Sequence, residues 1–216
     1  MPQPIILSQL LVIVVLIGTT SGEVTPFQAD ILPDLRHLND DNYILLRPIT
    51  YSSSSGRTQK YSITVPRGFV TDLASIPWGV QPFVPKTDSH SSPAILHDYL
   101  YWEQACSPEE SDALFQLELE DAQVGCFRRW LIDVGLGIGG ENAWDENKEK
   151  REQGYIKIIP ENNIPCDPGK PCDTNIRWGG FQQRLYNEGV RRTLPPINQT
   201  SPSYCAAGNL AEDKTE

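Results

Sequence analysis

Apolar and polar residues alternate in short runs in the first third of the chain, and this pattern predicts a small antiparallel sheet. Residues 43–51 are apolar and β-branched but include Pro48, which is typical of an edge strand. A Ser-rich turn at 52–56 leads to the alternating run 61–65, so these two runs are expected to form a hairpin. A third short strand is expected at 68–71.

The segment that follows has the features of two consecutive helices. Ser92 and Pro93 are residue types favoured at the cap and at the first position of a helix, and this helix is expected to end at Cys106. Ser107 and Glu110 then form the pattern of a capping box, which predicts the start of a second helix.

The second helix is expected to be amphipathic, with Asp112, Phe115 and Leu119 on one face. Gly125 is expected to end it. A third helix, interrupted by glycines, is expected over residues 127–140.

The N-terminus resembles a targeting signal. Residues 5–18 form an apolar run of signal-peptide length, and small residues follow at 20–22. The segment before the run, MPQP, contains no Lys or Arg, so an uncleaved membrane anchor is the alternative interpretation. Cleavage would give an exported chain, and the sequence therefore predicts a secreted or periplasmic protein.

These patterns together predict an α+β fold, in which a small antiparallel sheet packs on a two- or three-helix core. From Asp145 onward the chain is polar and rich in proline, which predicts a loop-rich C-terminal arm with a disordered tail. The expected organisation is a signal peptide at 1–22, a core domain at 23–145 and the arm at 146–216.

All five cysteines lie after the apolar N-terminal run, and in an exported protein such cysteines are expected to form disulfides. Cys166 and Cys172 bracket a tight loop and make the simplest local pair. Cys106 and Cys126 could clip the two ends of a helix to other elements, or one of them could reach Cys205. One cysteine stays unpaired in any scheme, and no spacing matches a structural zinc site.

The charge balance excludes one class of partner. Asp and Glu number 28 against 18 Lys and Arg, for a formal net charge of −10. Nucleic-acid binding needs clustered cations, so no nucleic-acid partner is expected.

His97 and Asp98 are the candidate chemical centre, because they lie side by side in an otherwise apolar helical segment. Such a segment rarely tolerates two ionisable groups unless they are paired or used in function. Adjacent helical positions point about 100° apart, so the two side chains should serve different partners. The structural alternative is that His97 completes a buried polar network and Asp98 bonds a backbone turn.

Several motifs occur in a fixed order along this part of the chain. Together they resemble the domain of unknown function 1353, a family found in bacterial and phage genomes. The resemblance covers about half of the chain and implies no established activity. The motifs are FVTDLASIP at 69–77, AILHDYLYW at 94–102, Asp112 with Phe115, and the run at 140–144.

A second resemblance implies a mechanism. The pattern Ala94-x-x-His97-Asp98-x-x-Tyr101, followed by Asp112 on the next helix, is similar to that of secreted phospholipase A2 enzymes. In those enzymes the His is the general base, the Asp after it binds calcium, and the later Asp orients the His. The resemblance therefore implies His97 as the base, Asp98 as a calcium ligand and Asp112 as the orienting carboxylate.

Two further residues are candidates for the same centre. Asp72 follows a predicted strand and is expected either to accept backbone N–H groups in a turn or to point at His97. Ser75 could complete a hydrolase triad with His97, but no Gly-x-Ser-x-Gly motif surrounds it.

Two functions follow from this centre. The first is a hydrolase that acts on a lipid or cell-envelope ester, with His97, Asp112 and Asp72 in the catalytic centre. The alternative is a non-catalytic module of phage type, structural or surface-interacting, in which these residues lock the helix pair to the turn after the last strand. An open pocket at His97 would favour the hydrolase, and complete burial would favour the module.

Overall fold

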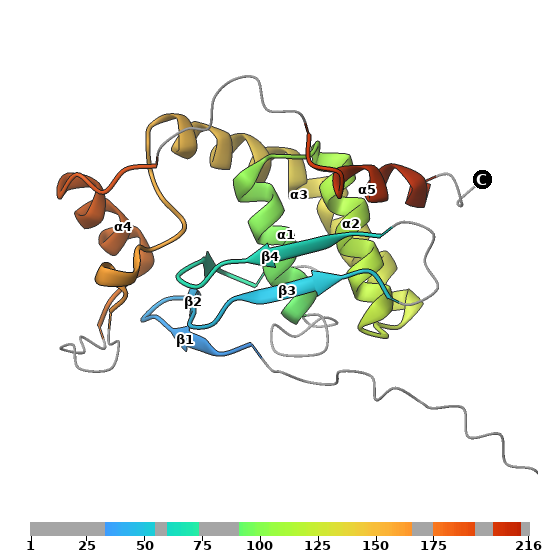
Figure 1. Cartoon of the computed structure of the whole chain (residues 1–216), viewed down its shortest axis with the longest axis horizontal. Coiled ribbons are helices and arrows are strands. Elements are labelled where there is room, and N and C mark those ends of the chain that lie inside the picture. The colour runs from blue at the N-terminus through green and yellow to red at the C-terminus, as the bar shows by residue number, and fades with distance from the viewer. Residues whose placement is uncertain (1–32, 55–59, 74–90, 166–174, 193–200, 213–216) are drawn as a thin grey trace, which may run out of the picture. The chain divides into compact units, whose positions relative to one another are not determined.

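The structure is a computed structural model that describes residues 33–54, 60–73, 91–165, 175–192 and 201–212 (Figure 1). The expected signal peptide at 1–22, Ser75, and the pair Cys166 and Cys172 lie outside the described residues. The chain folds as the predicted α+β class, with small antiparallel sheets and helices. Within the described residues, no helix is long and apolar enough to cross a membrane.

The strands form two small antiparallel sheets. The first has the order β1-β2-β5, and the second is the β3–β4 hairpin. The register of the hairpin pairs Ile49 with Val65 and Ser52 with Ser62, which confirms the expected hairpin. The strands are β1 (Leu35–His37), β2 (Tyr43–Leu45), β3 (Ile49–Ser52), β4 (Ser62–Val65) and β5 (Val70–Thr71).

The predicted strand at 43–51 is in fact two strands that belong to different sheets. It breaks just before β3, at Pro48, which has no N–H for a ladder bond. Residues from other segments hold the chain at the break through hydrogen bonds to Leu46. The Leu46 N–H donates to the Asp34 carbonyl at 2.7 Å, and Arg67 Nε donates to the Leu46 carbonyl at 2.9 Å. The break lets one apolar run supply both sheets.

The helix α1 (Ser91–Glu103) is buried along most of its length. It begins at Ser91, so Ser92 lies inside the helix and the prediction that Ser92 caps it is wrong. It ends before Cys106, which lies in the connection to α2. Since α1 contacts α2, α3, β4 and β5, it presents no solvated face, and this explains why its sequence is apolar all round.

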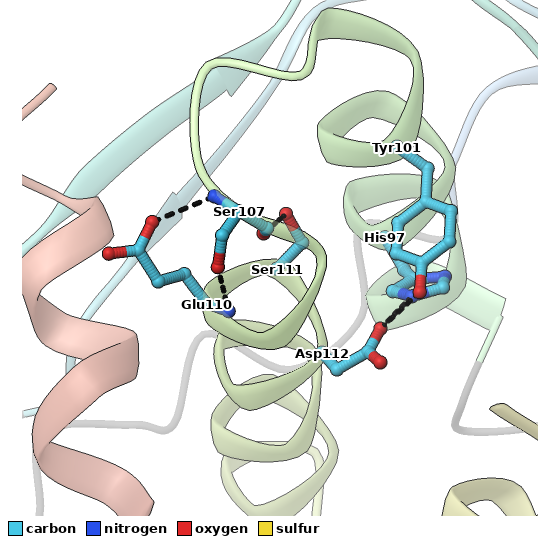
Figure 2. Close-up of polar contacts among 6 residues, drawn as sticks. All are labelled: His97, Tyr101, Ser107, Glu110, Ser111 and Asp112. Atoms are coloured by element: carbon cyan, nitrogen blue, oxygen red, sulfur yellow. Dashed lines mark hydrogen bonds and ion pairs between the residues drawn. The ribbon is translucent and has the colours of Figure 1, made fainter. Parts of the chain in front are cut away.

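The helix α2 (Pro108–Asp121) starts at the predicted capping box (Figure 2). Glu110 N–H donates to Ser107 Oγ at 3.2 Å, and Ser107 N–H donates to Glu110 Oε2 at 2.8 Å. The helix ends at Asp121, four residues earlier than predicted, because Gln123 adopts a positive φ of 57°. Gly125 caps the start of the next helix instead.

The helix α3 (Cys126–Glu152) is longer than predicted. It continues through the glycines, so the prediction that it ends at Gly140 is wrong. The stretch after Asp145 is polar because it forms the exposed surface of a helix, where Lys150 pairs with Glu146 at 2.6 Å. The first half of α3 also exposes apolar side chains, namely Phe127, Trp130, Val134 and Ile138.

The C-terminal arm contains the short helix η1 (Glu161–Asn163) and the helices α4 (Trp178–Asn187) and α5 (Cys205–Glu212), where loops and a disordered tail were predicted. Part of the arm packs on the sheet in an apolar cluster with Ile44 and Val70. Gly68 makes this contact close: it has a φ of 83°, and a Cβ there would lie 2.3 Å from the Ile159 carbonyl oxygen.

A disulfide between Cys106 and Cys205 ties α5 to the α1–α2 connection. Of the pairings left open by the sequence, it is the one in which a cysteine of the helical region reaches Cys205. Cys126 has a free, exposed thiol.

Candidate functional site

His97 on α1 and Asp112 on α2 point toward each other (Figure 2). His97 Nε2 and Asp112 Oδ1 are 2.8 Å apart. The ring of His97 lies between two aromatic rings, with centroid distances of 4.1 Å to Tyr101 and 4.6 Å to Phe115. The His97 side chain is only 6% exposed and that of Asp112 is 30% exposed, so the pair is shielded on the His97 side and reaches solvent at the carboxylate.

Tyr101 supports the same carboxylate. It lies one turn after His97 on α1, and its hydroxyl donates to Asp112 Oδ1 at 2.8 Å. Burial, together with the charge of Asp112, raises the pKa of Tyr101 well above its usual value, so the hydroxyl stays protonated and remains a donor. Trp144 packs edge-on against the Tyr101 ring at 5.2 Å, and a Cβ at Gly140 would lie 2.9 Å from the hydroxyl.

His97 lines a cavity of about 310 Å³. Within the described part of the chain, its only hydrogen bond is the one from Nε2 to Asp112. Nδ1 therefore has no hydrogen-bond partner among the described residues. Asp72, Asp98 and Lys157 line the same cavity.

Asp98 has different partners from His97, as its helical offset predicts. Its Oδ2 accepts a hydrogen bond from Thr71 Oγ1 at the end of β5, and the adjacent Leu73 N–H donates to the same Thr71 oxygen at 2.9 Å. Burial, and then the nearby charge of Asp72, raise the pKa of Asp98 to about 6, while Lys157 acts in the opposite direction. Asp98 thus joins α1 to the sheet, and Asp72 lies beside Asp98 and lines the same cavity as His97.

Part of the chain matches a known protein family. Residues 43–135 match the family described as "Protein of unknown function (DUF1353)". Over these residues the chain is similar to that family. The resemblance given by its sequence motifs is therefore confirmed. No match is found among curated proteins or among solved structures.

The DUF1353 segment holds most of the site but not all of it. It includes β2 to β5, α1, α2 and the start of α3, and with them His97, Asp98, Asp112 and Asp72. The second half of α3 and Lys157 lie beyond it, although they line the same cavity. The cavity is thus completed by residues outside the matched segment.

The donors around Asp98 do not match what calcium requires. Calcium takes six to eight oxygen ligands, usually with several carboxylates. Among the described residues, the carboxylate near Asp98 is that of Asp72, and Lys157 lies close enough to compete electrostatically with a cation. The one described cluster of three metal-binding residue types is Cys106, Glu110 and Cys205, whose sulfurs form the disulfide.

Replacing Asp98 with Asn tests both the electrostatics and the calcium hypothesis. The pKa of Asp98 is about 6 in the folded chain against 3.8 for the free side chain, so the folded state binds the proton more tightly. Wild-type stability should therefore fall as pH rises from about 4 to about 6. We expect Asp98→Asn to match the wild type near pH 4 and to exceed its free energy of unfolding by about 2 kcal/mol at pH 7.5.

Urea titrations of the wild type and of Asp98→Asn at both pH values, with and without calcium, measure these free energies of unfolding. A variant that is less stable than the wild type at pH 7.5 would contradict the electrostatic account. Calcium that stabilises the wild type but not the variant would show that Asp98 is a ligand.

Some features of the site had no strong sequence signal. Tyr101 was part of the sequence pattern around His97, but its contact with Asp112 was not predicted; its position four residues after His97 puts both on one face of α1. The contributions of Gly140, Trp144 and Lys157 come from elements whose packing the local sequence does not specify.

Proposed function

We propose that the protein is a hydrolase in which His97 activates water for attack on a carboxylic ester. The observation that carries this proposal is that Asp112 holds His97 at Nε2 while His97 lines a cavity and its Nδ1 has no hydrogen-bond partner among the described residues. A histidine with one nitrogen held by a carboxylate and the other open to substrate has the arrangement of a general base.

The proposed proton path uses residues in contact. With the Asp112 carboxylate as acceptor, the ring proton lies on Nε2, and the lone pair on Nδ1 is the base. Nδ1 takes a proton from water, the resulting hydroxide attacks the ester carbonyl carbon, and the imidazolium then returns the proton to the alcohol that leaves. Asp112 stabilises the transient imidazolium, and the Tyr101 hydroxyl holds Asp112 in place.

The similarity to secreted phospholipase A2 enzymes supports the choice of ester. The pair formed here, His97 with Asp112, is the one that the resemblance implies as base and orienting carboxylate. A lipid or cell-envelope ester outside the cytoplasm is therefore the first substrate class to test. In the alternative, non-catalytic module, the same bonds would serve only to fasten α1 to α2.

Replacing Asp112 with Asn separates these two functions. Asn can still accept the Tyr101 hydroxyl, but it can also donate to Nε2 and so favour the wrong ring tautomer. We expect kcat on short p-nitrophenyl esters to fall about 100-fold, with a changed pH profile of kcat. Asp133→Asn, an exposed position on α3, is the matched control and should retain wild-type rates.

The ester panel should include p-nitrophenyl esters and phospholipids, each with and without calcium. Hydrolysis by the wild type that Asp112→Asn reduces would support the enzyme. Absence of hydrolysis across the panel, or equal rates in the Asp112 and Asp133 variants, would favour the non-catalytic module.

A further inference from the structure

We infer that the cavity-facing side of α3 is a subsite for a straight aliphatic chain, which passes Gly139 on its way from His97. This inference rests on the proposed function and names the substrate class of the same site, an ester with an aliphatic acyl chain. It follows from the composition of the cavity wall, from the open space at Gly139, and from the size of the cavity.

The wall that α3 contributes is apolar for three turns and then becomes polar. Over about 18 Å of helix it offers no charge and no side-chain hydrogen-bonding group. One turn further on, the lining residues are Glu146, Asn147 and Lys150. The apolar members of this wall are Leu131, Ile132, Gly135, Leu136, Gly139, Gly140 and Ala143.

The glycines of this wall have different roles. Gly140 makes room for the protein itself, because a Cβ there would meet the Tyr101 hydroxyl at 2.9 Å. Gly139 also lines the cavity, but a Cβ there would meet nothing within 4 Å. The space in front of Gly139 is therefore cavity that no described side chain fills. Glycine inside a helix is unfavourable relative to alanine, so the room it leaves needs a reason.

An aliphatic chain fits this wall better than other substrate groups do. A sugar or a peptide would leave its own polar groups without partners against three apolar turns. The cavity of about 310 Å³ is at the small end of ligand pockets, which favours one narrow chain over a bulky ring system. Outside α3 the lining includes the polar residues Asp72, Asp98 and Lys157, so the whole cavity suits an amphipathic ester.

The subsite can be tested without relying on catalysis. Straight-chain methyl ketones carry an ester-like carbonyl but no cleavable bond, and their binding to the full chain can be followed by titration calorimetry. If the chain lies along α3, Kd should fall by roughly fourfold for each added methylene until the cavity is full. The same chain-length preference should appear in kcat/KM for p-nitrophenyl esters.

Gly139→Leu puts a side chain into the cavity, and Gly137→Leu is the matched control. Gly137 lies on the same helix, is exposed, has nothing within 4 Å of a Cβ, and does not line the cavity. Both variants replace glycine with a better helix former, so both should melt at or above the wild-type temperature. We expect Gly139→Leu to weaken binding of long ketones at least tenfold, with short ketones less affected, and Gly137→Leu to bind as the wild type does.

The outcomes for the subsite and for the proposed function are distinguishable. Ketone binding that depends on Gly139, in a protein that hydrolyses no ester, would support the subsite and overturn the hydrolase. Ester hydrolysis that does not change in Gly139→Leu would support the hydrolase and overturn the subsite. Equal affinity for short and long ketones in the wild type would also overturn the subsite.

Discussion

Replacing His97 with Gln is expected to lower kcat for ester hydrolysis about a thousandfold. The Gln amide can still donate to Asp112 from near the position of Nε2, but it has no nitrogen that can accept a proton from water. The loss should therefore appear in kcat, while the free energy of unfolding changes by no more than about 1 kcal/mol. Stopped-flow or steady-state hydrolysis, paired with urea unfolding, measures the two effects separately.

His37→Gln is the matched control for this variant. His37 is the other histidine among the described residues; it is exposed on β1 and does not line the cavity. Its replacement should leave both the rate and the stability unchanged. A His97→Gln variant that keeps the wild-type rate would show that another group is the base.

The pairing of His97 with Asp112 illustrates what the sequence can predict. Two ionisable groups in an apolar helix pointed to a polar centre there. Asp112 as the partner of His97 was implied by the resemblance to secreted phospholipase A2 enzymes. The hairpin of β3 and β4 was predictable, since a period of two fixes which side chains are buried. In both cases the signal is local or joins neighbouring elements.

Contacts between distant segments were not predictable in this way. The bridge between Phe69 and Ile158 depends on a glycine with positive φ before β5 and on an apolar pair after α3. Neither segment alone specifies the other. The apolar residues of the arm were consequently assigned to loops, although Trp178 and Phe181 cover the sheet from α4.

The length of α3 was not predicted because glycine in a helical sequence can either end the helix or lie within it where close packing requires a small residue. The cluster at 135–140 left both interpretations open, although the predicted helix stopped at residue 140. In the structure, Gly140 instead admits the Tyr101 hydroxyl, and Gly139 leaves space in the cavity. A glycine that serves packing or a cavity costs helix stability but does not end the helix, and only the tertiary neighbours distinguish the two cases.

Removing the disulfide between Cys106 and Cys205 is expected to have the largest effect on stability. The bond joins residues 99 positions apart, and closing a loop of that length restricts the unfolded chain strongly. We expect the double variant Cys106→Ala, Cys205→Ala to lose about 4 kcal/mol of unfolding free energy, measured by guanidinium titration. Cys126→Ala, which removes an exposed free thiol, should change it by less than about 0.5 kcal/mol.

The double variant also distinguishes the contribution of the Cys106–Cys205 disulfide to stability from that of any other disulfide. A reductant should destabilise the wild type by a similar amount if the bond between Cys106 and Cys205 is the one that matters, and it should have little effect on the double variant. A wild type with the same unfolding midpoint in both redox conditions would contradict the prediction. In that case the packing of α5 against α2, where a Cβ at Gly208 would lie 2.6 Å from the Glu110 carbonyl oxygen, would have to hold the C-terminus without covalent help.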